Sequence, residues 1–191
     1  MENRRSCYLA ALALSVVCLL SPLVMRGQSF SLATNALDYA NFGTMNVEGA
    51  VAAGRHWSLT AVAKYNPFLH TRRDGEALSA RQQLYGAGVR YWPWHVYAGW
   101  WAGARMQYQE YNRGGIQSAQ TDEGDRYGLG LSGGYSYMLT PHWNLDVGMG
   151  VWGGYDKFTT YSCPVCGVTT AQGTRLFLLP SDLLVSLVYV F

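Results

Sequence analysis

The sequence has few charged residues. Only 14% of its 191 residues are Asp, Glu, Lys or Arg, against roughly 25% in an average soluble domain. After the N-terminal segment it also lacks any run of about 20 apolar residues, which excludes an internal transmembrane helix. Instead it is rich in glycine (22), tyrosine (14) and tryptophan (7). This composition is unusual for a cytosolic protein.

Residues 1–27 have the pattern of a secretory signal peptide. A basic start is followed by apolar residues 8–20, a stretch of signal-peptide length. We expect cleavage after Gly27, which leaves residues 28–191 as the mature domain. An uncleaved membrane anchor and a lipoprotein signal ending at Cys18 are the alternatives.

The mature chain carries no net charge. Removing the signal takes away three of the 14 basic residues and one of the 12 acidic residues, which leaves 11 of each. A neutral chain gives no electrostatic reason to expect a nucleic-acid partner.

The stretch YGLGLSGGYSY, residues 127–137, alternates large and small side chains. A period of two is typical of a β-strand with one apolar face. Similar alternation recurs along the chain and predicts eight strands. They cover residues 30–39, 44–54, 57–67, 80–92, 95–109, 125–139, 142–157 and 179–191.

The connections between these strands differ in length. Three are short turns, whereas longer loops are expected at residues 68–79, 110–124 and 158–178. Short turns at one end, long loops at the other and an even number of strands are typical of a transmembrane β-barrel. The predicted fold is therefore all-β, an eight-stranded antiparallel up-and-down transmembrane β-barrel.

A soluble sandwich or lipocalin-like barrel is the alternative, with the apolar faces turned inward. Two features argue against it: the second face of each strand is mostly Gly and Ser, and aromatic residues gather at strand ends. Tyr and Trp concentrate at membrane interfaces because they have an apolar body and a polar tip. The expected interface residues are Trp57, Trp92, Trp143, Tyr127, Tyr137 and Phe191.

Charges of both signs fall on the small-residue face. An eight-stranded barrel is just wide enough to be filled by side chains, so we expect these charges to pair across the interior and fill it. A proton or ion path is the alternative. The expected interior charges are Glu48, Lys64, Arg90, Arg105 and Asp146, with Asp38 as a further candidate.

Cys163 and Cys166 lie in the longest predicted loop. After a secretory signal the expected state of such a pair is an oxidised disulfide. A metal site completed by His70 and a redox-active pair are the alternatives, although two cysteines supply only half of a zinc site.

Histidines give little support for catalysis or for a metal. Three of them, His56, His95 and His142, lie beside a Trp in different short turns, on the order of 10 Å apart, too far for one zinc ion. His70 is the candidate base of a lipid-modifying enzyme, but no nucleophile stands out near it. We therefore expect no catalytic residue, no cofactor and no metal.

Several short motifs give the chain a family resemblance. They are TNAL at residues 34–37, NVE at 46–48, RHWSL at 55–59, RYW at 90–92, CPVCG at 163–167 and the ending VSLVYVF. Together they resemble an uncharacterised family of small outer-membrane β-barrel proteins of Gram-negative bacteria, a domain of unknown function often near fimbrial genes. The resemblance implies the fold and an outer-membrane location.

The C-terminus also resembles outer-membrane barrels in general. It ends in Phe191, preceded at two-residue steps by Tyr189, Leu187 and Val185. In that class the last strand is read by the barrel-assembly machinery. A plain buried last strand is the alternative.

The resulting hypothesis is a non-enzymatic outer-membrane barrel with surface-exposed loops. Its role would be adhesion, fimbria-related surface assembly or stabilisation of the envelope. The expected partners are outer-membrane lipid, the barrel-assembly machinery and a surface or fimbrial-type protein. An outer-leaflet lipid-modifying enzyme and a barrel that binds a lipid or small ligand are the alternatives.

Overall fold

The computed structural model describes residues 30–71, 77–114, 120–162 and 168–191. The predicted signal peptide, residues 1–27, lies outside these ranges, and its cleavage stays a prediction. Cys163 and Cys166 also lie outside the described residues.

The described chain is built almost entirely of strands, with one short helix, α2 (Ala36–Ala40). Within these residues, no helix is long and apolar enough to cross a membrane. The strands are β1 (Phe30–Asn35), β2 (Met45–Ala52), β3 (Trp57–Asn66), β4 (Leu69–Thr71), β5 (Ala77–Tyr91), β6 (Gly99–Gly114), β7 (Thr121–Met138), β8 (Trp143–Tyr161) and β9 (Thr169–Val190).

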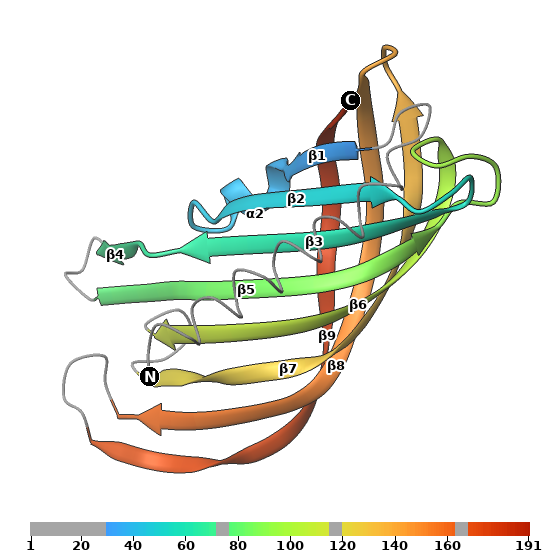
Figure 1. The fold of residues 1–191 in the computed structure, drawn as a ribbon. Helices are drawn as coiled ribbons and strands as arrows, with labels where there is room; N and C mark the ends of the chain where they lie inside the picture. Colours follow the sequence, from blue (N-terminus) through green and yellow to red (C-terminus); the bar gives the residue numbers. More distant parts are fainter. Residues whose placement is uncertain (1–29, 72–76, 115–119, 163–167) are drawn as a thin grey trace, which may run out of the picture.

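Eight of these strands form a closed antiparallel barrel (Figure 1). Sequential neighbours pair along the chain, β3 pairs with β5, and β1 returns to pair with β9. The three-residue β4 lies outside the barrel and pairs only with the start of β5. The predicted eight-stranded antiparallel barrel is thus confirmed.

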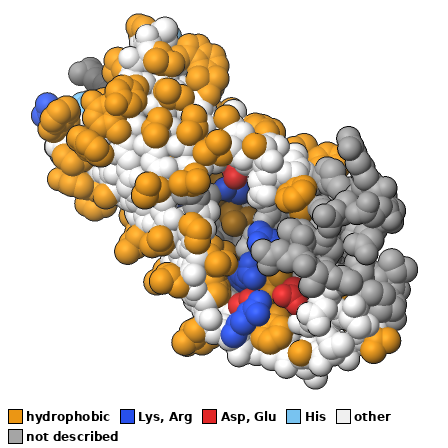
Figure 2. All heavy atoms as spheres, turned by 180° about the vertical axis from the view of Figure 1, so that it is seen from behind, with side chains coloured by type: hydrophobic (Ala, Val, Ile, Leu, Met, Phe, Trp, Pro, Cys, Tyr) orange, Lys and Arg blue, Asp and Glu red, His pale blue; other side chains and the backbone are white. Residues whose placement is uncertain are grey.

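The two-residue period places one set of side chains outside the barrel and the other inside. On β7, the large residues of the 127–137 stretch point outward, and both Leu129 and Leu131 are 65% exposed. The residues between them alternate with these and face the interior, where Ser136 is buried. Figure 2 accordingly shows orange apolar side chains spread over the outer surface of the barrel on the face in view.

The first predicted strand was too long. β1 ends at Asn35, and residues 36–40 form α2 instead of continuing the strand to residue 39. The physical reason is the cap: the Asn35 side chain accepts a hydrogen bond from the backbone N–H of Leu37, as N-terminal capping residues do.

The later strands were predicted too short, and the long loops correspondingly too long. β7, β8 and β9 contain 18, 19 and 22 residues. Each gains most of its extra length at the long-loop end, where a polar sequence hides the period of two. Beyond the apolar band, both faces of a strand meet polar surroundings, so hydrophobic alternation no longer marks the strand.

Strand β6 was predicted to begin too early. It starts at Gly99 and not at residue 95, because Tyr97 and Gly99 both have positive φ, 64° and 77°, in a tight turn. This turn folds Val96 and Tyr97 into the barrel, where they are 4% and 3% exposed.

These turn residues belong to an apolar plug at the short-turn end of the barrel. Trp92 was predicted at the membrane interface, but it is only 1% exposed and lies in this plug. Its indole Nε1–H donates to Ser58 Oγ at 3.0 Å, and its ring lies 6.3 Å from that of Trp101. Trp92 lies two residues after the inward-facing Arg90, and Tyr91 between them is 41% exposed, so the period of two of β5 continues to Trp92 and places it inside.

The glycine-rich inner face of β7 and β8 makes room for this plug. A Cβ added at Gly134 or Gly148 would lie only 2.8 or 3.1 Å from the Trp101 ring. The small residues on the inner face therefore allow large side chains from neighbouring strands to cross the barrel.

We predict that Trp92→Ala lowers the free energy of unfolding by about 3–5 kcal/mol, because it removes a fully buried ring and its hydrogen bond. Trp94→Ala is the matched control: Trp94 is 69% exposed, and its loss should cost less than about 1 kcal/mol. Urea titration of the folded protein measures both. Equal losses for the two variants would contradict the plug.

Candidate functional site

Among the side chains that the structure describes, the interior contains three groups of charged residues between the plug and the long-loop end. The first crosses the barrel. Glu48 on β2 pairs with Arg90 on β5 and, at 3.6 Å, with Arg105 on β6. Arg90 also reaches Asp146 on β8 at 3.3 Å. These side chains are at most 13% exposed, so four strands are joined by ion pairs shielded from bulk solvent.

Arg90 also ties this group to the apolar plug. Its guanidinium lies over the Trp101 ring, 4.3 Å from the ring centre. Such cation–π contacts are strongest when the cation is shielded from water. The plug and the first charged layer therefore pack as one unit.

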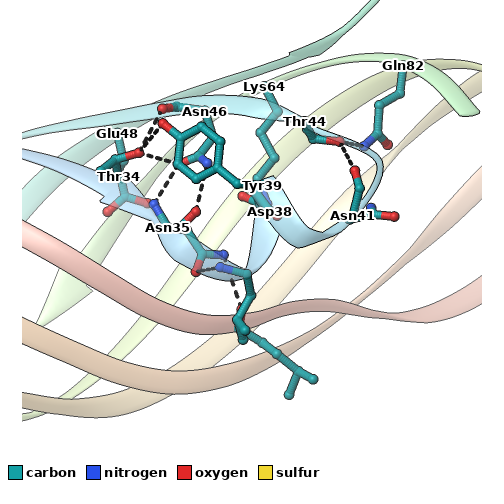
Figure 3. A network of polar contacts seen from close by, with 12 residues as sticks. Thr34, Asn35, Asp38, Tyr39, Asn41, Thr44, Asn46, Glu48, Lys64 and Gln82 are labelled. Carbon is teal, nitrogen blue, oxygen red and sulfur yellow. Dashed lines mark hydrogen bonds and ion pairs between the residues drawn. The ribbon is translucent and has the colours of Figure 1, made fainter. Parts of the chain in front are cut away.

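The second group closes the barrel under α2 (Figure 3). Lys64 on β3 pairs with Asp38 of α2 at 2.8 Å. Next to this pair, Asn35 and Asn46 join β1 to β2: the Asn46 side chain accepts from the Asn35 N–H at 2.6 Å and donates to the Asn35 carbonyl at 2.9 Å.

The same asparagine ties β1 to β9. The Asn35 side chain donates to the Leu183 carbonyl at 3.1 Å and accepts from the Val185 N–H at 3.0 Å. The junction between β1 and β9 therefore depends on side-chain as well as backbone hydrogen bonds.

The interior at this level is nearly full. The cavity bordered by Asp38, Lys64 and Arg105 has a volume of only about 10 Å³. This is room for about one water molecule. The arrangement fits a barrel whose interior is filled by paired side chains.

The third group was missed by the sequence analysis. Asp156 on β8 is fully buried and receives three donors: Tyr111 Oη at 2.8 Å, Arg175 Nε at 2.8 Å and Arg126 Nη2 at 3.3 Å. The Arg126 guanidinium also lies 3.8 Å from the centre of the Tyr111 ring. Asp156 shares the inner face with Asp146 at an even-numbered spacing, which was the available signal.

Two phenols have altered acidity. Burial, reinforced by the hydrogen bond to Asp156, raises the pKa of Tyr111. In the short turn, burial raises the pKa of Tyr97 to about 12. Both phenols are therefore neutral at physiological pH, and that of Tyr111 donates to Asp156.

Strand β9 is paired on only part of one side. It pairs with β8 along residues 169–189, but with β1 only along residues 186–190. Within the described residues, positions 169–183 therefore have no strand partner on the β1 side. Figure 2 shows a recess in the molecule, in which Lys, Arg, Asp and Glu side chains are visible below the apolar outer surface.

The structure places each predicted interior charge and each predicted interface aromatic on one side of the barrel wall. The five charges lie inside and pair as described. Five of the six interface residues point outward and are 41–57% exposed, whereas Trp92 is buried in the plug. The five are Trp57, Trp143, Tyr127, Tyr137 and Phe191.

The turn histidines bind backbone carbonyls. His56 Nδ1 lies 2.9 Å from the Trp92 carbonyl, and His142 Nδ1 lies 2.9 Å from that of Val190. His70 is part of β4, and its side chain lies outside what the structure describes. Among the described residues, no group of three His, Cys, Asp or Glu side chains could hold a metal.

Comparison with known proteins places the chain in a family. The model of the family DUF3575, protein of unknown function, matches residues 12–191. The chain belongs to this family. DUF3575 is uncharacterised, as the sequence motifs implied, and no curated protein matches the chain. The fold and interior described here are therefore those of a DUF3575 member, and its role has to be inferred from its geometry.

We predict that Glu48→Gln lowers the free energy of unfolding by about 3–5 kcal/mol, because an amide of the same shape cannot balance two buried guanidinium charges. The control is Glu123→Gln, on the outward, exposed side of β7, where the change should stay within about 0.5 kcal/mol. Denaturant titration compares them. If Glu48→Gln is as mild as the control, the interior pairs are not structural.

Proposed function

We propose that this protein is an integral outer-membrane β-barrel that anchors a surface-exposed sheet and has no catalytic role. The observation that carries the proposal is the inverted distribution of side chains. Large apolar residues cover the outside, among them Trp100 at 62%, Met106 at 69% and Met149 at 67% exposed. Charges fill the inside. In water this arrangement would be unfavourable, because apolar surface is exposed while charges lose hydration.

The height of the apolar band supports a bilayer. Tyr127 and Tyr137 point outward at the two ends of the band on β7 and are ten residues apart. At about 3.4 Å per residue and a tilt of about 40°, they span about 26 Å, close to the roughly 25 Å apolar band of outer-membrane barrels.

Aromatic pairs at both ends of the band support the same reading. At the long-loop end, Tyr127 and Tyr155 on neighbouring strands have ring centres 5.9 Å apart. At the short-turn end, the ring centres of Trp143 and Tyr189 lie 4.9 Å apart, and those of Tyr189 and Phe191 lie 4.8 Å apart. Such girdles stabilise a barrel at the two membrane interfaces.

A sheet continues beyond the long-loop girdle on one side of the barrel. It includes the outer ends of β5, β6, β7, β8 and β9, because β5 pairs with β6 as far out as Ser79 and Gly114. Figure 1 shows these strands reaching past the short β1 and β2. Its outward face carries Glu110, Glu123, Asp125 and Lys157, next to a groove of about 590 Å³. We infer that this polar sheet is the part presented to a surface partner, in adhesion, fimbria-related assembly or envelope stabilisation.

The paired interior supports a role without catalysis or transport. Each charge of the first two groups is committed to an opposite charge on another element. A proton or ion path would need charged groups that change partners, and a catalytic centre would need an accessible reactive group.

We predict that Leu131→Arg in the middle of the band lowers the free energy of unfolding in lipid vesicles by about 2–4 kcal/mol, the cost of a charge on the lipid face at mid-depth. Thr174→Arg, on the outer face of β9 beyond the girdle, is the control and should change stability by less than about 1 kcal/mol. Urea-induced unfolding in vesicles measures both.

A barrel surrounded by water would tolerate both arginines equally, within about 0.5 kcal/mol. That result, or recovery of the native protein in the soluble periplasmic fraction, would contradict the proposal.

A further inference from the structure

The interrupted seam between β1 and β9 forms a side opening in the barrel. The backbone pairing of the two strands ends at Asn35 and Ser186. Beyond it, the last hydrogen bonds between them are those of the Asn35 side chain with the backbone of Leu183 and Val185. From there to the long-loop end, β9 runs on with β8 as its only described strand partner. We call this region, between α2 and residues 175–182 of β9, the side opening.

The side opening ends at the level of the outer aromatic girdle. Arg126 and Asp156 are the chain neighbours of Tyr127 and Tyr155, two tyrosines of that girdle whose ring centres lie 5.9 Å apart. Arg175 is the cross-strand partner of Asp156. In the membrane orientation proposed above, this third charged group therefore lies at the depth of lipid headgroups.

The third group carries an excess positive charge. Arg126 and Arg175 share a single carboxylate, that of Asp156. Farther outward, Arg113 and Asp122 are cross-strand neighbours of opposite sign and together add no formal charge. One positive charge thus remains beside Asp156.

One hydrogen-bond donor of this group also lacks an acceptor. Arg126 is only 7% exposed, and its Nη1 has no hydrogen-bond partner in the described part of the chain. The side chain of Arg175 is 45% exposed, which leaves this guanidinium accessible from outside. A buried donor without an acceptor is unfavourable, and an anion beside Arg175 would offset the charge of the pair.

The free edge of β9 calls for a polar occupant at this depth. Open sheet edges occur at membrane depth only where they are buried in protein or line a hydrated space. Pro180 has no N–H to donate, and next to it Ser181 of β9 forms a β-bulge opposite residues 150–151 of β8; a proline and a bulge are both common at free edges. On the outer side, Leu176 and Leu178 are 75% and 76% exposed and form an apolar flank.

We propose that the side opening binds a membrane phospholipid by its anionic headgroup. The phosphate contacts the guanidinium of Arg175, with the buried charge of Arg126 behind it, and the acyl chains lie outside along Leu176 and Leu178. Guanidinium groups bind phosphate through paired, charge-assisted hydrogen bonds. This inference rests on the proposed membrane location and adds a specific lipid site to it.

The test is native mass spectrometry of the full chain purified in detergent and mixed with dioleoylphosphatidylglycerol, with dioleoylglycerol or with inorganic phosphate. We expect one retained phosphatidylglycerol, bound about tenfold more tightly than dioleoylglycerol, which has the same chains and no phosphate. Arg175→Gln should remove this preference, and Arg175→Lys should keep part of it because the charge remains.

Lys157→Gln is the matched control. It removes one positive charge at nearly the same height, on the outward face of the neighbouring strand, and should leave lipid retention unchanged. Equal effects of Arg175→Gln and Lys157→Gln would mean that the preference reflects general surface charge, which would overturn the site.

Three other results would also overturn the inference. These are equal retention of the two lipids by the unaltered protein, displacement of the lipid by millimolar inorganic phosphate, and a co-purified peptide that occupies β9 in place of lipid. A protein that inserts into vesicles but retains no phosphatidylglycerol contradicts only this inference. A protein that is soluble without detergent contradicts the proposed function as well.

Discussion

The pairing of β1 with β9 is the constraint on which the structure depends. Five cross-strand residue pairs and the side chain of Asn35 close a sheet that would otherwise have two open edges. Closure gives the barrel an inside and an outside, and so allows the two faces of every strand to meet different surroundings. Because β1 pairs with only a few residues of the long β9, the rest of β9 keeps a free edge. This free edge borders the side opening.

Most of the fold was predictable from the period of two. Alternating large and small residues predicted eight strands and their outward faces, and the confirmed antiparallel barrel follows from them. The failures occur where that period carries no information. The capped helix after Asn35, the inward turn at Tyr97 and the polar outer ends of β7, β8 and β9 are set by local backbone geometry or by surroundings that are polar on both faces.

The interior was predictable in part. Charges on a narrow inner face have to pair, and Glu48, Arg90, Arg105 and Asp146 do so. The Asp156 group lay in segments assigned to loops or to strand ends, and it depends on the register between β6, β7, β8 and β9. Register depends on how the strands pair in space, and a single sequence does not define it. Trp92 differs from these residues, because its position two residues after the inward-facing Arg90 already indicated an inward side chain.

The central claim is that the outward face of each strand meets lipid and the inward face meets a filled, polar interior. Spin labels attached to single cysteines at positions 129, 131 and 132, in a chain whose own cysteines are replaced by serine, test it most directly in vesicles. We predict that labels at 129 and 131 collide readily with oxygen, which concentrates in the bilayer, and that the label at 132 does not. Equal access of a water-soluble paramagnetic nickel complex to all three labels would contradict the account.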